Sequence, residues 1–202
     1  LGDYQLKKVN KDGRDFTKID FSGKNITTNK KGWAELPYFG IPVQLPDNKN
    51  VDVEVVSVSY DEIDIDFPLI PSRGVITRDQ DPDKIPYKTD PNSITDGWYP
   101  ASNLKTSEPY ILRKVRGENI YIYPFQYNAV KKRLKVVKDI TIKITPNDEL
   151  PVNPLSRKDA VNIEMNPVYE SLFVNYKMDS RWSEEIGEFG DVLVIYTSAY
   201  NS

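Results

Sequence analysis

The sequence contains neither cysteine nor histidine in its 202 residues. These absences exclude a Cys–His or Ser–His–Asp catalytic centre, a zinc site with its usual ligands, and a CxxC redox pair. Without disulfides, the chain must be stabilised by packing of its side chains. We therefore do not expect this chain to be an enzyme.

An excess of basic charge and a long apolar run are also missing. The chain has 27 Lys and Arg against 30 Asp and Glu, a net charge of -3, which argues against a general nucleic-acid binder. No apolar run approaches the roughly 20 residues that span a bilayer. Residues 1–10 lack the apolar stretch of a signal peptide, so in an exported protein that signal is already removed.

The residues that are abundant favour β structure. Thirteen Tyr, seven Phe and three Trp accompany 15 Pro and 10 Gly, a mixture that predicts short strands and turns. Residues 51–55 alternate Val with acidic residues, as in a half-buried strand. Residues 119–145 read as a long β-hairpin that turns within 127–132, with a bulge near 138–139.

The N-terminal part predicts shorter elements. Residues 16–21 and 26–33 read as strands on either side of a turn at 22–24. Residues 35–46 contain three prolines, which cannot lie in a central strand and therefore indicate an edge strand or a loop.

One helix is predicted near the C-terminal end, over residues 167–176. Asn166 can cap it, Pro167 suits its first position, and an apolar face is formed by Val168, Leu172 and Tyr176. Residues 191–196 then form a nearly continuous apolar run, typical of a strand buried on both faces. This run fits either the first strand of a second, α/β domain that is otherwise absent, or one more strand of the β domain.

Residues 61–100 are the best candidate for a functional segment. They hold six prolines, many acids and only two arginines, Arg73 and Arg78, and long loops are usually functional or disordered. Arg78 ends a short extended stretch over 75–79 that resembles a trypsin-like substrate, and its guanidinium can pair bidentately with a buried carboxylate. The alternative is a solvated surface arginine among acids.

Calcium binding is a second idea for the same region. Asp61, Glu62, Asp64 and Asp66 supply carboxylate oxygens, the ligands that Ca²⁺ prefers. The alternation of these acids with Ile63 and Ile65 indicates instead a solvated face of a strand.

Several motifs together resemble the N-terminal prodomain of the gingipains, which are secreted cysteine peptidases of family C25. They fall in the family's order, over most of residues 16–181, at the segments 70–78 (IPSRGVITR), 81–87 (DPDKIPY), 109–117 (PYILRKVRG), 124–128 (PFQYN) and 169–176 (YESLFVNY). Such a series is far more specific than any single motif.

The resemblance implies an all-β fold, a β-sandwich of jelly-roll type with one short helix, over residues 1–181. Residues 182–202 would be a linker and the first strand of the downstream catalytic domain. The partner would be that C25-type domain of the chain's own precursor. No catalytic residue, cofactor or metal ligand is carried over, and the precursor would be exported through the periplasm, then secreted or held at the cell surface.

The resemblance also assigns two sites. Arg78 matches the basic residue that enters the S1 pocket of the peptidase, flanked by Ile76, Thr77 and Asp79. Arg181, followed by Trp182, matches the processing site, and Arg73 is the runner-up for the pocket. The competing hypothesis is a stand-alone β-sandwich binding module, an adhesin or carbohydrate-binding domain, with stacking platforms formed by Trp98, Tyr99 and Tyr123.

Overall fold

The computed structural model describes residues 3–22, 26–156 and 163–177. Apart from a short helix and three 3-10 turns, its regular elements are antiparallel strands, which confirms the expected all-β fold. The strands are β1 (Tyr4–Lys11), β2 (Arg14–Phe21), β3 (Phe39–Gln44), β4 (Asn50–Asp64), β5 (Leu104–Thr106), β6 (Tyr110–Leu112), β7 (Val115–Ile122), β8 (Phe125–Asn128) and β9 (Arg133–Asn147), followed by α1 (Asn166–Leu172).

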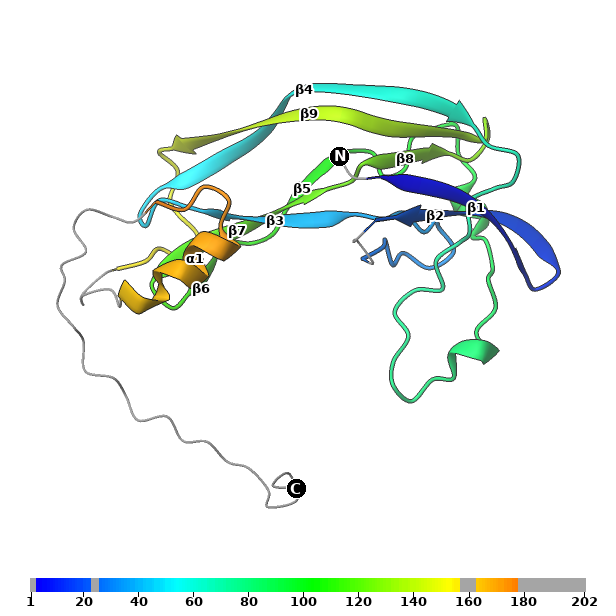
Figure 1. The fold of residues 1–202 in the computed structure, drawn as a ribbon, viewed down its shortest axis with the longest axis horizontal. Helices are drawn as coiled ribbons and strands as arrows, with labels where there is room; N and C mark the ends of the chain where they lie inside the picture. The colour runs from blue at the N-terminus through cyan, green and yellow to red at the C-terminus, as the bar shows by residue number, and fades with distance from the viewer. Residues whose placement is uncertain (1–2, 23–25, 157–162, 178–202) are drawn as a thin grey trace, which may run out of the picture.

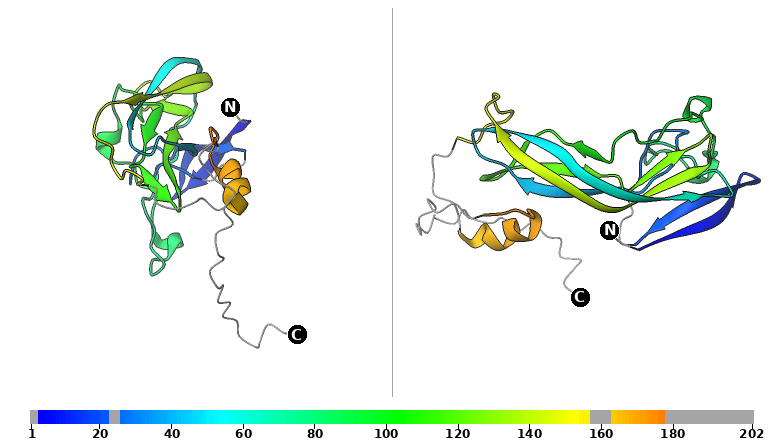
Figure 2. Two further views of the ribbon diagram at one scale, coloured as in Figure 1. Left: turned by 90° about the vertical axis from the view of Figure 1, so that its left-hand side faces the viewer. Right: turned by 90° about the horizontal axis from the view of Figure 1, so that it is seen from above.

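The strands form three antiparallel sheets that pack as layers (Figures 1 and 2). One sheet has the order β4-β9-β8, and another has β3-β7-β5, with β6 also paired to β7. The hairpin β1-β2 forms the third. The long pair β4-β9 is bulged at Val56 and at Lys138, because the register shifts between Val55 and Ser57 and between Ser59 and Tyr60. The predicted bulge near residue 138 is confirmed.

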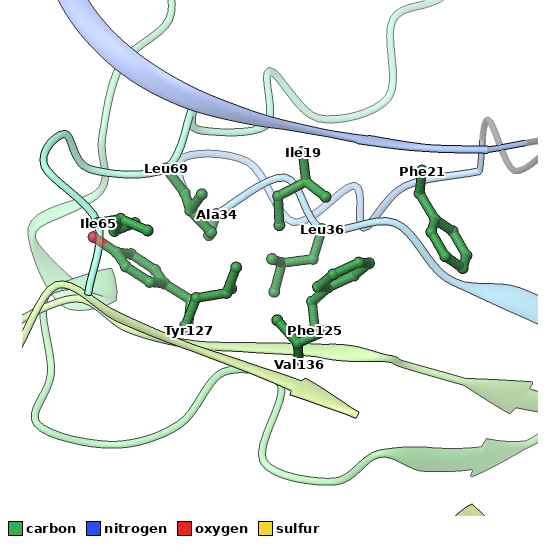
Figure 3. Close-up of a cluster of buried hydrophobic side chains, with 10 residues drawn as sticks. Ile19, Phe21, Ala34, Leu36, Ile65, Leu69, Phe125, Tyr127 and Val136 are labelled. Atoms are coloured by element: carbon green, nitrogen blue, oxygen red, sulfur yellow. The ribbon is translucent and has the colours of Figure 1, made fainter. Parts of the chain in front are cut away.

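Two apolar clusters between the layers form most of the core. The larger one joins β2, β8 and β9 with buried side chains from the loops, including Leu36 and Leu69, and Figure 3 shows these side chains pointing toward one another. The second joins Val43, Ile120 and Ile122 to half-buried residues of β4 and β9. At about 25 cal/mol per Å² of apolar surface, this burial stabilises a chain that has no cross-links.

The predicted strands are partly right. The Val residues at 51, 53 and 55 are half-buried, as their alternation predicts. The hairpin predicted over 119–145 is smaller, because Pro124 separates β7 from β8 and β7 pairs with β3 in the other sheet. β3 is an edge strand, which is one of the two alternatives that the prolines of residues 35–46 indicated. The strand predicted over 26–33 is wrong, since these residues form only an isolated bridge, from Thr27 to Pro37.

The helix is shorter than predicted and uses a different face. Its N-cap position is Met165 rather than Asn166, and it ends at Leu172. The buried side chains are Tyr169 and Phe173, which pack on Val115 of β7. Val168 and Leu172, predicted to form the apolar face of the helix together with Tyr176, are exposed. The rings of Tyr169 and Phe173 occupy the surface that β7 offers, so the aliphatic side chains of Val168 and Leu172 face outward.

Arg116 is the largest fully buried side chain, with no exposed surface. Its guanidinium donates hydrogen bonds to the main-chain carbonyls of Pro46, Lys49, Val152 and Asn153, at 2.7–3.2 Å. Burial lowers the pKa of Arg116, while nearby carboxylates raise it, and an arginine stays charged in either case. The side chain therefore ties the segment that follows β9 to the loop between β3 and β4. Arg116 lies on β7, whereas Arg113 lies in a turn after β6, with φ of 54°.

We predict that Arg116→Met lowers the free energy of unfolding by about 3–5 kcal/mol, because four main-chain carbonyls lose their buried donor. Urea denaturation measures this change. Arg113→Met is the matched control, since Arg113 is exposed, and it should change stability by less than about 0.5 kcal/mol. Equal stability of the two variants would contradict the role of Arg116.

Candidate functional site

The segment that joins β4 to β5 covers residues 65–103 and contains only short 3-10 turns and isolated bridges. Between Ser72 and Asp90 it projects beyond the sheets, as the turquoise-to-green loop of Figure 1 shows. The second view in Figure 2, left, shows the same projection. We call residues 73–89 the Arg78 loop. A loop of this length needs specific contacts to hold one shape.

Gly32 closes the base of the Arg78 loop with two hydrogen bonds. Its N–H donates to the carbonyl of Ser72 at 2.8 Å, and its carbonyl accepts from the N–H of Asp90 at 3.0 Å. Gly32 has φ of 78°, and a Cβ there would lie 2.7 Å from the Cβ of Asp90. Glycine is therefore required both for the left-handed backbone and for the close approach of Asp90.

Inside the loop, Arg73 and Tyr87 form a brace. The Arg73 guanidinium donates to the carbonyl of Pro82 and lies 4.6 Å from the centre of the Tyr87 ring. The tip of the β1-β2 hairpin contacts the same residue: Lys11 Nζ lies 5.8 Å from the ring centre, and Asp12 Oδ2 accepts the Tyr87 N–H at 2.6 Å. Arg73, the runner-up for the pocket, is thus engaged within the protein.

Glu35 lies close to this brace and is half-buried. Burial raises the pKa of Glu35, and the positive charges of Lys18 and Arg73 offset only part of that effect. The folded state therefore favours the protonated acid. The preference for protonated Glu35 stabilises the folded state fully at pH values below the ordinary pKa of glutamic acid. This stabilisation is lost as the pH rises through the pKa of Glu35 in the folded state.

Arg78 lies on a tight turn of the loop. The Gln80 N–H donates to the Thr77 carbonyl at 3.1 Å, and Gln80 Oε1 accepts the Thr77 N–H at 3.1 Å. A hydrogen bond from the Thr77 side chain, above all, lowers the pKa of Asp79. Within the described part of the chain, the exposed Arg78 guanidinium has no hydrogen bond, ion pair or ring contact. Its neighbours shape the turn and leave the cation available.

The structure brings the candidate residues of this loop together. Thr77, Arg78 and Asp79 are exposed, and Ile76 is half-buried. The extended stretch predicted through Asp79 is wrong beyond Thr77, because the Gln80 side chain closes the turn. The predicted processing site at Arg181 and Trp182, and the apolar run at 191–196, lie outside the described residues.

The end of the described chain is fixed to the free edge of β3 by two side-chain amides. The Asn175 amide accepts from the Gln44 N–H at 2.7 Å and donates to the Gln44 carbonyl at 3.0 Å. The Gln44 amide accepts from the Lys177 N–H at 2.8 Å and donates to the Lys177 carbonyl at 3.3 Å. We call these four hydrogen bonds the Gln44 clamp. It covers main-chain groups of an edge strand that would otherwise be open to pairing.

The residues of the two competing site hypotheses are engaged elsewhere. Asp61, Glu62 and Asp64 form ion pairs with basic residues of β9 across the strand pair, and within the described residues no cluster of three acids suits a metal ion. Trp98 lies under the ammonium of Lys135. Tyr99 packs on Trp33 and Tyr123 stacks on Tyr38, with ring centres 4.8 and 5.1 Å apart. These rings contact their own neighbours.

Four residues that hold the loop and the chain end were not predicted from the sequence: Gly32, Tyr87, Asp12 and Gln44. Asp12 and Tyr87 are 75 residues apart along the chain, and Gln44 and Lys177 are 133 apart, so local patterns cannot reveal these contacts. The one local signal was Asp12-Gly13, a dipeptide typical of a two-residue hairpin turn.

With this geometry in place, comparison with known proteins identifies the family. The family model Propeptide_C25 matches residues 2–182. The chain belongs to the C25 propeptide family. Gingipain R2 of Porphyromonas gingivalis is 31% identical over 178 residues, which are 88% of this chain and 24% of that protein. Gingipain R1 of the same bacterium is 29% identical over 177 residues, 88% of this chain and 18% of that protein. This C25 propeptide thus spans less than a quarter of the length of these curated relatives.

Two solved structures share the fold. A complex of Porphyromonas gingivalis RgpB pro- and mature domains matches with a TM-score of 0.76 at 29% identity, over 87% of this chain and 89% of that chain. A structure that concerns zymogenic latency of gingipain K, from the same bacterium, matches with a TM-score of 0.63 at 23% identity, over 71% and 81%. The second match supports the fold alone. The family and fold that the sequence motifs indicated are confirmed. In the described ranges of this C25 propeptide, no helix is both long and apolar enough to cross a membrane.

We predict that Gly32→Ala loosens the Arg78 loop, because the added Cβ cannot fit against Asp90. Limited proteolysis should cut within residues 73–89 faster than in the parent chain. Gly13→Ala is the matched control, since Gly13 also has positive φ, 73°, but a Cβ there meets nothing within 4 Å. Strain from positive φ is then common to both variants, and equal cutting of the two would contradict the Gly32 contact.

Proposed function

We propose that this C25 propeptide maintains the latency of the peptidase domain of its own precursor and assists the folding of that domain. The Arg78 loop lies across the active-site cleft and blocks it. The observation that carries the proposal is the exposed Arg78 cation on a closed turn of a loop that is fixed at its base and braced inside. The related RgpB forms a complex of its pro- and mature domains, which supports the same pairing for this chain.

Arg78 fills the S1 pocket like the P1 residue of a substrate. A guanidinium presents parallel N–H donors that match both oxygens of a carboxylate at the floor of such a pocket. Because an inhibitor of this kind must satisfy the preference of the pocket that it fills, arginine at this position indicates an arginine-specific peptidase. Ile76 and Thr77 occupy the adjacent non-primed subsites, and Asp79 lies on the primed side.

The closed turn explains how Arg78 inhibits without serving as a good substrate. Both hydrogen bonds between Thr77 and Gln80 must break before the chain can extend through the cleft. The Gly32 hydrogen bonds and the brace formed by Arg73 and Tyr87 keep the ends of the loop together, so the loop cannot open to release the turn. A loop ordered before binding also loses less conformational entropy on binding, which strengthens the complex.

Separation of the domains requires a second site, and we assign it to the bond between Arg181 and Trp182. The Gln44 clamp holds the chain through Lys177, four residues before Arg181. Residues 1–181 are then the prodomain, and residues 182–202 are the linker and first strand of the catalytic domain. On the family resemblance, the precursor is exported, matures in the periplasm, and is then secreted or held at the cell surface.

Arg78→Ala should weaken inhibition of the mature peptidase by the 202-residue chain at least about 30-fold, the loss expected for a residue that dominates an interface. Hydrolysis of a small arginyl substrate gives the inhibition constant. Lys84→Ala is the control within the same loop, because its side chain is 84% exposed. An unchanged inhibition constant for Arg78→Ala would remove Arg78 as the anchor.

Arg181→Ala should stop the release of the prodomain from the full precursor, because an arginine-specific peptidase loses its P1 residue. Gel electrophoresis with N-terminal sequencing of the products follows the release. Lys177→Ala is the control, because it also removes one positive charge but lies four residues upstream. This precursor should be processed normally. Release of a chain that begins at Trp182 from the Arg181→Ala precursor would contradict the assignment.

A further inference from the structure

Two arginines of this chain lie on paired strands, where a peptidase cannot reach their peptide bonds. A peptidase cuts a segment only when that segment lies open and extended in its cleft, so a segment in a sheet must first unfold locally. Arg116 lies on β7 and is fully buried. Arg133 lies on β9, between β4 and β8, and its guanidinium is paired with Asp64 and Glu62.

The other described arginines are restrained in different ways. Arg14 begins β2 and is paired with Lys11 across the β1-β2 hairpin. Arg113 has φ of 54°, which is left-handed backbone rather than the extended backbone that a cleft requires. Arg73 is bound within the brace, and Arg78 lies on the closed turn. In the described part of the chain, each arginine thus has its main chain paired or turned, or its side chain bound.

Lys88, in the Arg78 loop, is restrained much less than these arginines. The backbone is extended at Ile85 on one side, with φ −94° and ψ 109°, and at Asp90 on the other, with φ −76° and ψ 125°. Within the described ranges, the exposed Lys88 has no ion pair or ring contact, and neither its side chain nor its main chain forms a hydrogen bond. The N–H groups of Tyr87 and Asp90 hold the chain on either side but leave the bond after Lys88 open.

We propose that Lys88 is a specificity-determining residue of this C25 propeptide, because lysine at this open position keeps the Arg78 loop intact beside a peptidase that cuts after arginine. This inference rests on the proposed function, which gives the peptidase its arginine specificity. A pocket that pairs with the parallel N–H donors of a guanidinium binds the single ammonium of lysine poorly. The loop presents arginine where the chain is closed and lysine where it is open, so inhibition does not end in a cut.

The test replaces Lys88 by arginine, which keeps the charge and supplies the residue that the peptidase prefers. The 202-residue chain with Lys88→Arg is incubated with a molar excess of the mature peptidase of its precursor, and separately with a serine endoprotease specific for arginine. Lys143→Arg is the matched control, because the Lys143 side chain is 61% exposed but its main chain is paired with β4 at Glu54. Mass spectrometry of the products locates the cuts.

Both enzymes should cut Lys88→Arg after residue 88, at least about tenfold faster than they cut the parent chain within residues 73–89. Inhibition by this variant should be lost with time as the cut proceeds, whereas Lys143→Arg should remain uncut at residue 143 and inhibit like the parent. Survival of the Lys88→Arg loop against both enzymes would overturn the inference.

A second measurement needs no variant. A serine endoprotease specific for lysine should cut the folded parent chain after Lys88, because the inference requires that bond to be open. No cut after Lys88 under conditions that cut other exposed lysines would overturn the inference. Early cutting of the parent by the mature peptidase after Arg14, Arg73 or Arg113 would also overturn it, since lysine at position 88 would then protect nothing.

The inference and the proposed function can fail separately. If the parent does not inhibit the mature peptidase, but that peptidase cuts Lys88→Arg after residue 88, the role of Lys88 stands and the proposed function is wrong. If Arg78→Ala loses inhibition while Lys88→Arg inhibits for as long as the parent does, the proposed function stands and the role of Lys88 is wrong.

Discussion

The main chain of Gly32 joins the two ends of the Arg78 loop, and the remaining features of the site depend on that junction. A loop that leaves the fold at Ser72 and returns at Asp90 loses conformational entropy when its ends are brought together, and it has no strand pairing of its own to offset that loss. Two hydrogen bonds to one residue close it, and only glycine allows Asp90 to come this near. With the base closed, the contacts of Arg73, Asp12 and Tyr87 can fix the interior.

The two arginines of this loop have opposite roles, and their surroundings determine which is which. Arg73 is bound to a carbonyl and stacked on a ring, so its charge stabilises the loop from within. Arg78 has its neighbours bonded to one another across the turn, which leaves its own side chain exposed. Arg116 is a third case, a buried cation that ties two loops to β7. The three arginines therefore have different roles: Arg73 stabilises the loop, Arg78 is the candidate anchor, and Arg116 joins two loops inside the fold.

Part of this arrangement was predictable from the sequence, and the rest was not, for physical reasons. Alternation of Val with acids located β4, and the series of motifs indicated the C25 propeptide family, because both signals are local. β1 was missed because six of its eight residues are exposed and polar patterning hides it. The face of α1 was assigned wrongly because tertiary packing selected Tyr169 and Phe173 over an equally periodic aliphatic stripe. The braces of the Arg78 loop join distant residues, so only the folded chain reveals them.

The central claim is that the Arg78 loop is ordered before it meets the peptidase and is covered when it binds. Amide hydrogen exchange of the 202-residue chain, alone and with the mature peptidase of its precursor, tests both halves directly. The account predicts slow exchange at Gly32, Tyr87 and Asp90 in the free chain, and new protection at Arg78 and Asp79 only in the complex. Unprotected amides at Gly32, Tyr87 and Asp90 in the free chain, or no new protection at Arg78 and Asp79 on binding, would contradict it.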